Sequence, residues 1–271
     1  MNRIASAFEE ARRAGRMTFM PFVTAGDPDT ETTSQVLLAL RDARVDLIEL
    51  GFPYSDPIAD GPVIQASYTR ALNNGITVQQ IFDMMTALKD QKLPPVLAMV
   101  SFAIIFRAGP RKFAEQAAAA GFSGLIVPDL PAEEGEEMSE IARSCGLDLV
   151  QLIAPTTTDR RTEQILAAST GFLYCISVAG TTGARQDLPV ELTSQLRSLR
   201  SKTKLPLAVG FGISSPDQVG TLEGVADGVI VGSAIVRQAA EGKTPDQAAK
   251  NVRILADQMT AAVAKARPSL S

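Results

Sequence analysis

The sequence predicts an α/β fold, a closed (β/α)8 barrel with an extra N-terminal helix. Short runs rich in Val, Ile and Leu recur along the chain, and each ends near Gly, Pro or Asp. Each run is followed by a segment with apolar residues at helical spacing. Continuous apolar strands that alternate with helices form parallel sheets covered by helices. Eight such units in 271 residues fit a closed barrel better than an open sheet.

The expected elements can be placed in order. A helix in residues 1–15, "MNRIASAFEEARRAG", is amphipathic and can cover the bottom of the barrel. The eight expected strands are Met17–Thr24, Val45–Leu50, Pro95–Phe102, Gly124–Asp129, Asp148–Ala154, Gly171–Ser177, Leu205–Phe211 and Asp227–Gly232. Helices are expected between them, for example in "TETTSQVLLALRDA" and "PRKFAEQAAAAG", and a last helix in residues 244–266. No linker divides the chain, so we expect residues 1–271 to form a single TIM-barrel domain.

The composition excludes several classes of function. The net charge of −4 gives no reason to expect nucleic acid or an anionic membrane as a partner. No apolar run approaches the roughly 18 residues that cross a bilayer, and residues 1–15 lack the apolar core of a signal peptide. Cys145 and Cys175 lie in apolar surroundings, as reduced thiols do. We therefore expect a cytoplasmic protein.

Histidine is absent from the chain. Acid–base chemistry must then use carboxylates, Tyr or Lys, and a metal held by His is excluded, so we expect no metal site.

Three glycine-rich segments follow the last three expected strands. They are "GTTGA" after the sixth, "GFGISSPDQ" after the seventh and "VGSAIV" after the eighth. In such barrels the loops after the strands form the active site, and backbone N–H groups at a helix start bind phosphate. The alternative for any one segment is that its glycines tighten a turn and that Ser214 or Ser233 caps a helix. Three segments together predict a phosphate site.

Two carboxylates are candidates for the chemistry. In "VDLIELG", alternation puts Val45, Leu47 and Glu49 on one face, which suits the barrel interior. An acid at the top of an apolar interior has a raised pKa, useful for acid–base catalysis near neutral pH. The following loop, stiffened by three prolines, offers Asp56 or Asp60 as a second acid, and the spacing does not choose between them.

The motifs together resemble one family. "ELGFPYSDPIADGPVIQ", "PFVTAGDP", "VPDLP", "AGTTGAR", "GFGISSP" and "GSAIV" are similar to those of tryptophan synthase alpha subunits, in the same order and over nearly the whole chain. The resemblance implies a lyase of tryptophan biosynthesis that cleaves indole-3-glycerol phosphate to indole and glyceraldehyde 3-phosphate. It also implies a beta subunit as partner in an alpha2beta2 heterotetramer, with pyridoxal phosphate in that partner and no cofactor in this chain. A stand-alone indole-3-glycerol phosphate lyase is the alternative.

The resemblance also implies roles for individual residues. Glu49 would be the acid–base residue, Asp60 would bind the indole N–H, and Tyr174 would lie near the substrate. The implied substrate and phosphate contacts are Phe22, Thr182, Gly183, Phe211, Gly212, Gly232 and Ser233. Three positions depart from the family pattern. Ser101 and Ala103 stand where many members have Tyr and Asn, and Val178 stands where an Arg is often seen.

Overall fold

Eight parallel strands close into a barrel in the order β1 to β8, with β8 paired to β1. The computed structural model describes residues 2–57, 60–131, 134–176, 190–210 and 212–269. The strands are β1 Thr18–Thr24, β2 Ile48–Gly51, β3 Val96–Met99, β4 Gly124–Ile126, β5 Asp148–Ile153, β6 Leu173–Ile176, β7 Leu207–Gly210 and β8 Gly228–Val231. Each of the eight lies within or one residue beyond an expected strand, so the predicted (β/α)8 TIM barrel is confirmed.

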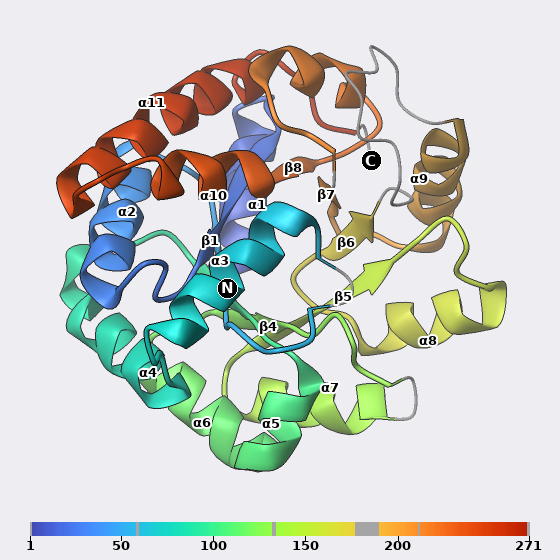
Figure 1. Cartoon of the computed structure of the whole chain (residues 1–271). Helices are drawn as coiled ribbons and strands as arrows, with labels where there is room; N and C mark the ends of the chain where they lie inside the picture. Colours follow the sequence, from blue (N-terminus) through green and yellow to red (C-terminus); the bar gives the residue numbers. More distant parts are fainter. Residues whose placement is uncertain (1, 58–59, 132–133, 177–189, 211, 270–271) are drawn as a thin grey trace.

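Helices surround this barrel and cover its outer face (Figure 1). They are α1 Arg3–Arg13, α2 Thr30–Asp42, α3 Pro62–Asn73, α4 Val78–Ala87, α5 Phe102–Ala108, α6 Pro110–Ala120, α7 Gly135–Ser144, α8 Asp159–Ala168, α9 Val190–Lys202, α10 Ser233–Ala240 and α11 Pro245–Val263. In the described part of the chain, 3-10 helices occupy Lys89–Gln91 and Pro216–Leu222. Several helices begin at the caps that their sequences predict; for example, the Asp29 carboxylate accepts the Thr32 N–H at the start of α2.

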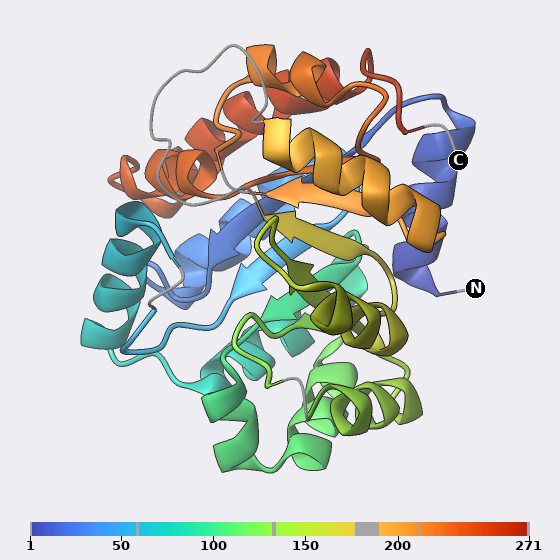
Figure 2. The ribbon, with the colours of Figure 1, turned by 90° about the vertical axis from the view of Figure 1, so that its right-hand side faces the viewer.

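Helix α1 closes the amino-terminal end of the barrel, as expected. Its buried residues Ile4 and Phe8 join the interior core, where the Phe8 ring lies 5.5 Å from that of Phe172. Arg3 ties the helix down by donating to the Leu93 carbonyl. Figure 2 shows α1 and α3 at opposite ends of the barrel. Because α1 closes the amino-terminal end, a site can form only at the carboxyl end of the strands, the end over which α3 lies.

The apolar residues form two layers, one inside the barrel and one between the barrel and its helices. Leu47 belongs to the inner layer, but Val45 packs in the outer layer. The prediction that Val45 shares the inward face is wrong, because β2 begins only at Ile48. Val45 still lies in the turn after α2, where its N–H donates to the Leu40 carbonyl.

The expected strands Pro95–Phe102 and Gly124–Asp129 are too long at their carboxyl ends, and the second ends at Ile126. β3 stops at Met99, and Phe102 begins α5 instead of ending a strand. The Asp129 carboxylate accepts the Ser101 hydroxyl at 2.6 Å and the Phe102 N–H at 2.7 Å. These bonds cap α5 from the segment after β4, a long-range contact that local periodicity does not reveal.

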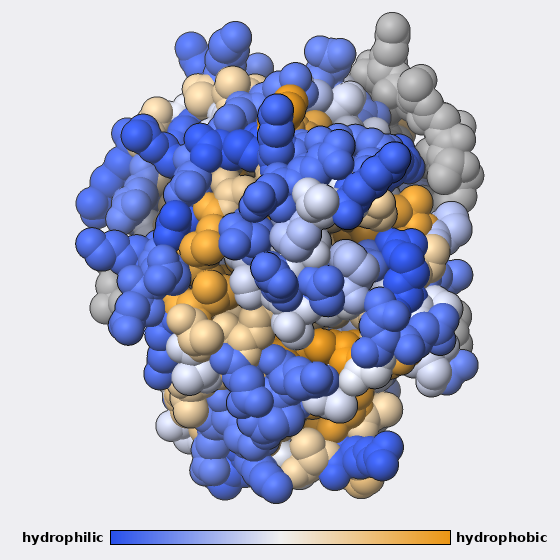
Figure 3. Space-filling model, turned by 60° about the vertical axis from the view of Figure 1, so that its left-hand side comes forward, coloured by the Kyte–Doolittle hydropathy of each residue, from blue (hydrophilic) through white to orange (hydrophobic). Residues whose placement is uncertain are grey.

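The outer surface is mainly hydrophilic. Figure 3 brings forward the side that carries α2 and α4 and shows small apolar patches among charged and polar side chains. In the described part of the chain, the large apolar residues that are exposed are Leu72, Phe106, Val190 and Ile254. No helix among the described residues is long and apolar enough to cross a membrane.

Docking of α1 gives a stability prediction. Phe8→Ala removes a ring that is 6% exposed and packs on Phe172, so we expect the free energy of unfolding to fall by about 3–5 kcal/mol. Phe106→Ala is the control, because Phe106 is 70% exposed and its loss should change stability by less than about 0.5 kcal/mol. Urea unfolding followed by circular dichroism measures both. Equal effects would contradict the docking described for α1.

Candidate active site

Glu49 points into the barrel from β2. Its neighbours across the sheet are Phe22 on β1 and Leu97 on β3. The residue is 0% exposed, and within the described residues neither carboxylate oxygen has a hydrogen-bond partner. Burial alone raises the pKa of Glu49 well above its ordinary value, because a charge is poorly solvated there. The site thus holds a carboxyl group whose protonated form is favoured by burial, as suits a proton donor.

Aromatic side chains fill the mouth above this layer, and glycines make room for them. A Cβ on Gly51 would clash with the Phe22 ring and lie 2.7 Å from the Tyr68 hydroxyl oxygen. A Cβ on Gly210 would clash with the Tyr174 ring, 2.5 Å from its hydroxyl oxygen. Close approach of this kind permits only glycine at these two strand ends. Phe22 and Tyr174, both singled out from sequence, therefore lie in the same mouth as Glu49.

Asp60 lies in the loop between β2 and α3, half-buried. Its N–H donates to the Pro57 carbonyl, and its own carbonyl accepts the Gln65 amide at 2.8 Å. Burial raises the pKa of Asp60 to about 6. Asp56, the alternative that spacing left open, is exposed and accepts the Ser55 hydroxyl. Of the two acids, Asp60 is the one that the structure places partly out of water.

Helix α3 carries this loop and is fixed to the barrel at several points. The Ser67 and Thr24 hydroxyls are 2.7 Å apart and both buried. Arg70 donates twice to the carboxylate of Asp27, which is buried after β1. These contacts hold α3 over the carboxyl end of the barrel (Figure 1), and the loop that contains Asp60 leads into its first residue.

The expected phosphate loops are described only in part. Gly212 has a φ of +102°, the left-handed region open to glycine. Gly232 precedes α10, Ser233 is its first residue, and no side chain in the described part of the chain caps it. The first-turn N–H groups of α10 can therefore receive an anion. Thr182, Gly183 and Phe211 lie outside the described residues.

The alternative that Ser214 or Ser233 caps a helix does not hold, because Ser215 is the N-cap of the 3-10 helix and Ser233 is the first residue of α10. The Ser214 N–H donates to the Gln218 side chain at 2.7 Å and is thus used within the protein. Among the described residues, the segments around Gly212 and Gly232 remain candidates for the anion.

Sequence reasoning missed Tyr68. It follows Ile64 by four residues on α3, and both side chains belong to the interior core. Side chains four residues apart lie on one helix face, so the apolar stripe of "PVIQASYTRALN" predicts an inward-facing tyrosine. The apolar stripe of this helix is the sequence feature from which Tyr68 could have been found.

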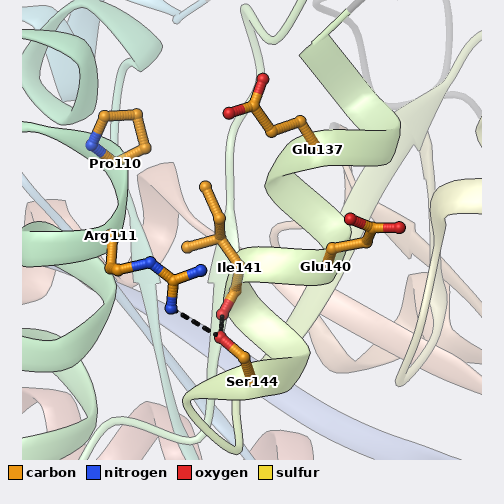
Figure 4. Close-up of a pocket in the computed structure, with 6 residues that line it drawn as sticks. All are labelled: Pro110, Arg111, Glu137, Glu140, Ile141 and Ser144. Atoms are coloured by element: carbon orange, nitrogen blue, oxygen red, sulfur yellow. Dashed lines mark hydrogen bonds between the residues drawn. The ribbon is translucent and has the colours of Figure 1, made fainter.

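Other hollows of the surface carry less chemistry. A groove of about 520 Å³ lies between α6 and α7, lined by Pro110, Arg111, Glu137, Glu140, Ile141 and Ser144. Arg111 donates to the Ser144 hydroxyl, which donates to the Ile141 carbonyl (Figure 4). Its central polar groups thus satisfy one another. No group of three or more potential metal ligands occurs among the residues that the structure describes.

The fold is a (β/α)8 barrel, the class of protein in which enzymes carry their sites at the carboxyl end, and that end here holds the buried acid Glu49 and the half-buried acid Asp60. The family model described as tryptophan synthase alpha chain matches residues 8–264. The chain is 48% identical over 263 residues to the tryptophan synthase alpha chain of Rhodopirellula baltica, covering 95% of each. The chain belongs to the tryptophan synthase alpha chain family. Its activity is therefore the lyase reaction of that family, cleavage of indole-3-glycerol phosphate in tryptophan biosynthesis, and the stand-alone alternative is not favoured.

Solved structures agree with this assignment. The alpha subunit of tryptophan synthase from Legionella pneumophila superposes with a TM-score of 0.88 at 34% identity, covering 97% of this chain and 98% of that one. A structure described as the tryptophan synthase a2b2 complex of Pyrococcus furiosus gives a TM-score of 0.84 at 39% identity, covering 90% and 98%.

Buried Glu49 leads to a stability prediction with a defined sign. Its folded-state pKa is raised, so the folded protein loses stability as pH rises above the unfolded-state value of about 4.3. The Glu49→Gln side chain cannot ionise. We therefore expect the free energy of unfolding of this variant at pH 8 to exceed that of wild type by on the order of 1–2 kcal/mol. The difference from wild type should grow between pH 5 and pH 8 in urea unfolding.

Glu115→Gln is the matched control, because Glu115 is exposed on α6. It should leave the pH dependence of unfolding unchanged. If Glu49→Gln is less stable than wild type at both pH 5 and pH 8, burial is not the cause of the raised pKa of Glu49.

Proposed function

We propose that Glu49 and Asp60 perform the cleavage of indole-3-glycerol phosphate at the barrel mouth. The observation that carries this proposal is the complete burial of Glu49 without a partner among the described residues. A structural glutamate in that position would be paired with a cation or bonded to N–H groups. An unpaired acid inside a core is costly, and such costs are typical of functional sites.

The reaction needs an acid and then a base at one position. Protonated Glu49 would transfer its proton to C3 of the indole ring, which leaves a positive charge spread towards the ring nitrogen. The Glu49 carboxylate would then take the proton of the substrate hydroxyl while the C–C bond breaks. The products are indole and glyceraldehyde 3-phosphate, and Glu49 is again protonated. A raised pKa suits both steps, because it favours the protonated form that donates first and makes the carboxylate a stronger base afterwards.

Asp60 would stabilise the positively charged intermediate. Ionised, it would accept a hydrogen bond from the indole N–H, an interaction that strengthens as the ring becomes cationic. The pKa of about 6 keeps this carboxyl ionised above that pH. Phe22 and Tyr174 would pack around the ring system from β1 and β6.

The phosphate would lie at the start of α10. Gly232 and Ser233 offer N–H groups there, and Gly212 approaches from the segment after β7. Gly183 and Phe211 are proposed to complete this site, and Thr182 to cover the substrate.

We further propose that the chain works with a beta subunit, in an alpha2beta2 heterotetramer whose beta subunit holds pyridoxal phosphate. The Pyrococcus furiosus structure, described as an a2b2 complex, supports this proposal. So does α5, which begins directly after β3, at the open end of the barrel. Its Phe106 is exposed, and its Phe102 is half-buried with the two rings 6.1 Å apart. An exposed aromatic pair is typical of a protein interface.

Two further proposals concern the domain organisation and the location of the protein in the cell. We infer that residues 1–271 form one domain, because α1 and α11 at the two ends of the chain both pack on β1. We propose that the protein acts in the cytoplasm, where free cysteines such as Cys145 and Cys175 stay reduced.

Substitution of the acids tests the mechanism. We expect Glu49→Gln and Asp60→Asn each to lower kcat/KM for indole release by about 10²–10⁴-fold. Wild-type kcat/KM should fall as the pH drops below about 6, because Asp60 then becomes protonated. Asp56→Asn is the matched control and should retain activity within about twofold. Activity of Glu49→Gln near the wild-type rate would reject the proposed role of Glu49.

Substitution on α5 tests the partner surface. Phe106→Ala should weaken binding to a tryptophan synthase beta subunit by about tenfold or more, measured by isothermal titration calorimetry. Ile254→Ala provides the comparison, because Ile254 is 51% exposed on α11, across the ring from α5 (Figures 1 and 2). Equal binding by the two variants would place the interface elsewhere.

A further inference from the structure

The Tyr68 hydroxyl has a place in the mouth that packing does not explain. The side chain is 2% exposed and belongs to the interior core. Its hydroxyl oxygen reaches the end of β2, where it would lie 2.7 Å from a Cβ on Gly51. Gly51 follows Glu49 by two residues and therefore shares its inward face. The phenol thus stands one layer above Glu49.

The hydroxyl makes no hydrogen bond within the part of the chain that the structure describes, and its oxygen is not fully buried. A phenylalanine would fill the same volume, so packing does not require the hydroxyl. The group is therefore placed for a partner that comes into the mouth during the reaction.

Asp60 is the acceptor that the electrostatics favour. The pKa of Tyr68 is raised well above its ordinary value, first by burial, then by the charges of Asp60, Tyr54 and Glu49 in that order. The rings of Tyr54 and Tyr68 are 5.6 Å apart, so the loop that carries Asp60 packs directly on Tyr68.

The proposed chemistry also selects Asp60 over Glu49. A hydrogen-bond donor lowers the pKa of the carboxyl that accepts it. Lowering the pKa of Glu49 would oppose its use as an acid, whereas lowering that of Asp60 keeps it ionised beside a forming cation.

We infer that Tyr68 is a positioning residue: in the substrate-bound site its hydroxyl donates a hydrogen bond to the Asp60 carboxylate and holds it ionised and directed into the mouth. This inference rests on the proposed role of Asp60. Within the described residues, the titratable groups that share the mouth with these two are Glu49, Tyr54 and Tyr174. Asp56 and Asp129 also act on Tyr54.

The test is the pH dependence of kcat for indole release by the full chain with a beta subunit present, because kcat reports the pKa values of the substrate-bound enzyme. The rate falls at low pH as Asp60 becomes protonated, and this fall is the acid limb of the profile. In Tyr68→Phe, loss of the donor should move the midpoint of the acid limb to a higher pH, by about one unit. At pH 8 Asp60 is ionised with or without the donor, so the loss of activity should be smallest there. At pH 6 it should be several-fold slower.

Ser67→Ala is the matched control, because it removes the bond to Thr24 that holds α3 without touching the phenol. It should change kcat by the same factor at every pH and leave the midpoint of the low-pH fall in place. A Tyr68→Phe profile of that kind would overturn the inference, since it would mean that Tyr68 only packs.

Asp60→Asn separates this inference from the function on which it rests. Loss of the acid limb together with most of the activity supports the role of Asp60. If that occurs while Tyr68→Phe leaves the limb unmoved, only the inference about Tyr68 fails. If Asp60→Asn retains the limb, the role of Asp60 fails first, and the role of Tyr68 fails with it.

Discussion

Burial of one ionisable carboxyl group inside an apolar barrel is the constraint on which this site depends. Glu49 is placed by strand pairing on both sides, from Phe22 and from Leu97, so its position is as rigid as the sheet. Its oxygens have no partner among the described residues, which opposes folding, and the extensive core of two apolar layers offsets that cost. The same burial raises the pKa of Glu49 and favours its protonated form.

The second acid is positioned by different means. Asp60 lies on a loop, where geometry is less precise than on a strand. Helix α3 compensates, because its Ser67 and Arg70 bond to residues at and after the end of β1. Tyr68 extends the same helix face into the mouth. Glu49 is thus held by the sheet itself, whereas Asp60 is held by a helix that lies over the sheet.

Much of the fold was predictable from the order of apolar runs. Each strand is buried on both faces, and such strands appear in sequence as continuous Val, Ile and Leu segments. The ends of strands were less predictable. Periodicity continued β3 to Phe102, but Asp129 from the next unit caps a helix there. Val45 was placed on the wrong face because alternation holds only where a strand is paired.

For the site, the sequence by itself determined which residue types are present and at which strand ends they stand. The long motifs were sufficient to indicate the family, and the absence of histidine left acid–base work to carboxylates, Tyr or Lys. Tertiary structure decided what local spacing left open. It put Asp56 in water and Asp60 partly out of it, and it brought Tyr68 to Gly51. Burial is the physical reason, because desolvation and close approach depend on segments that are distant along the chain.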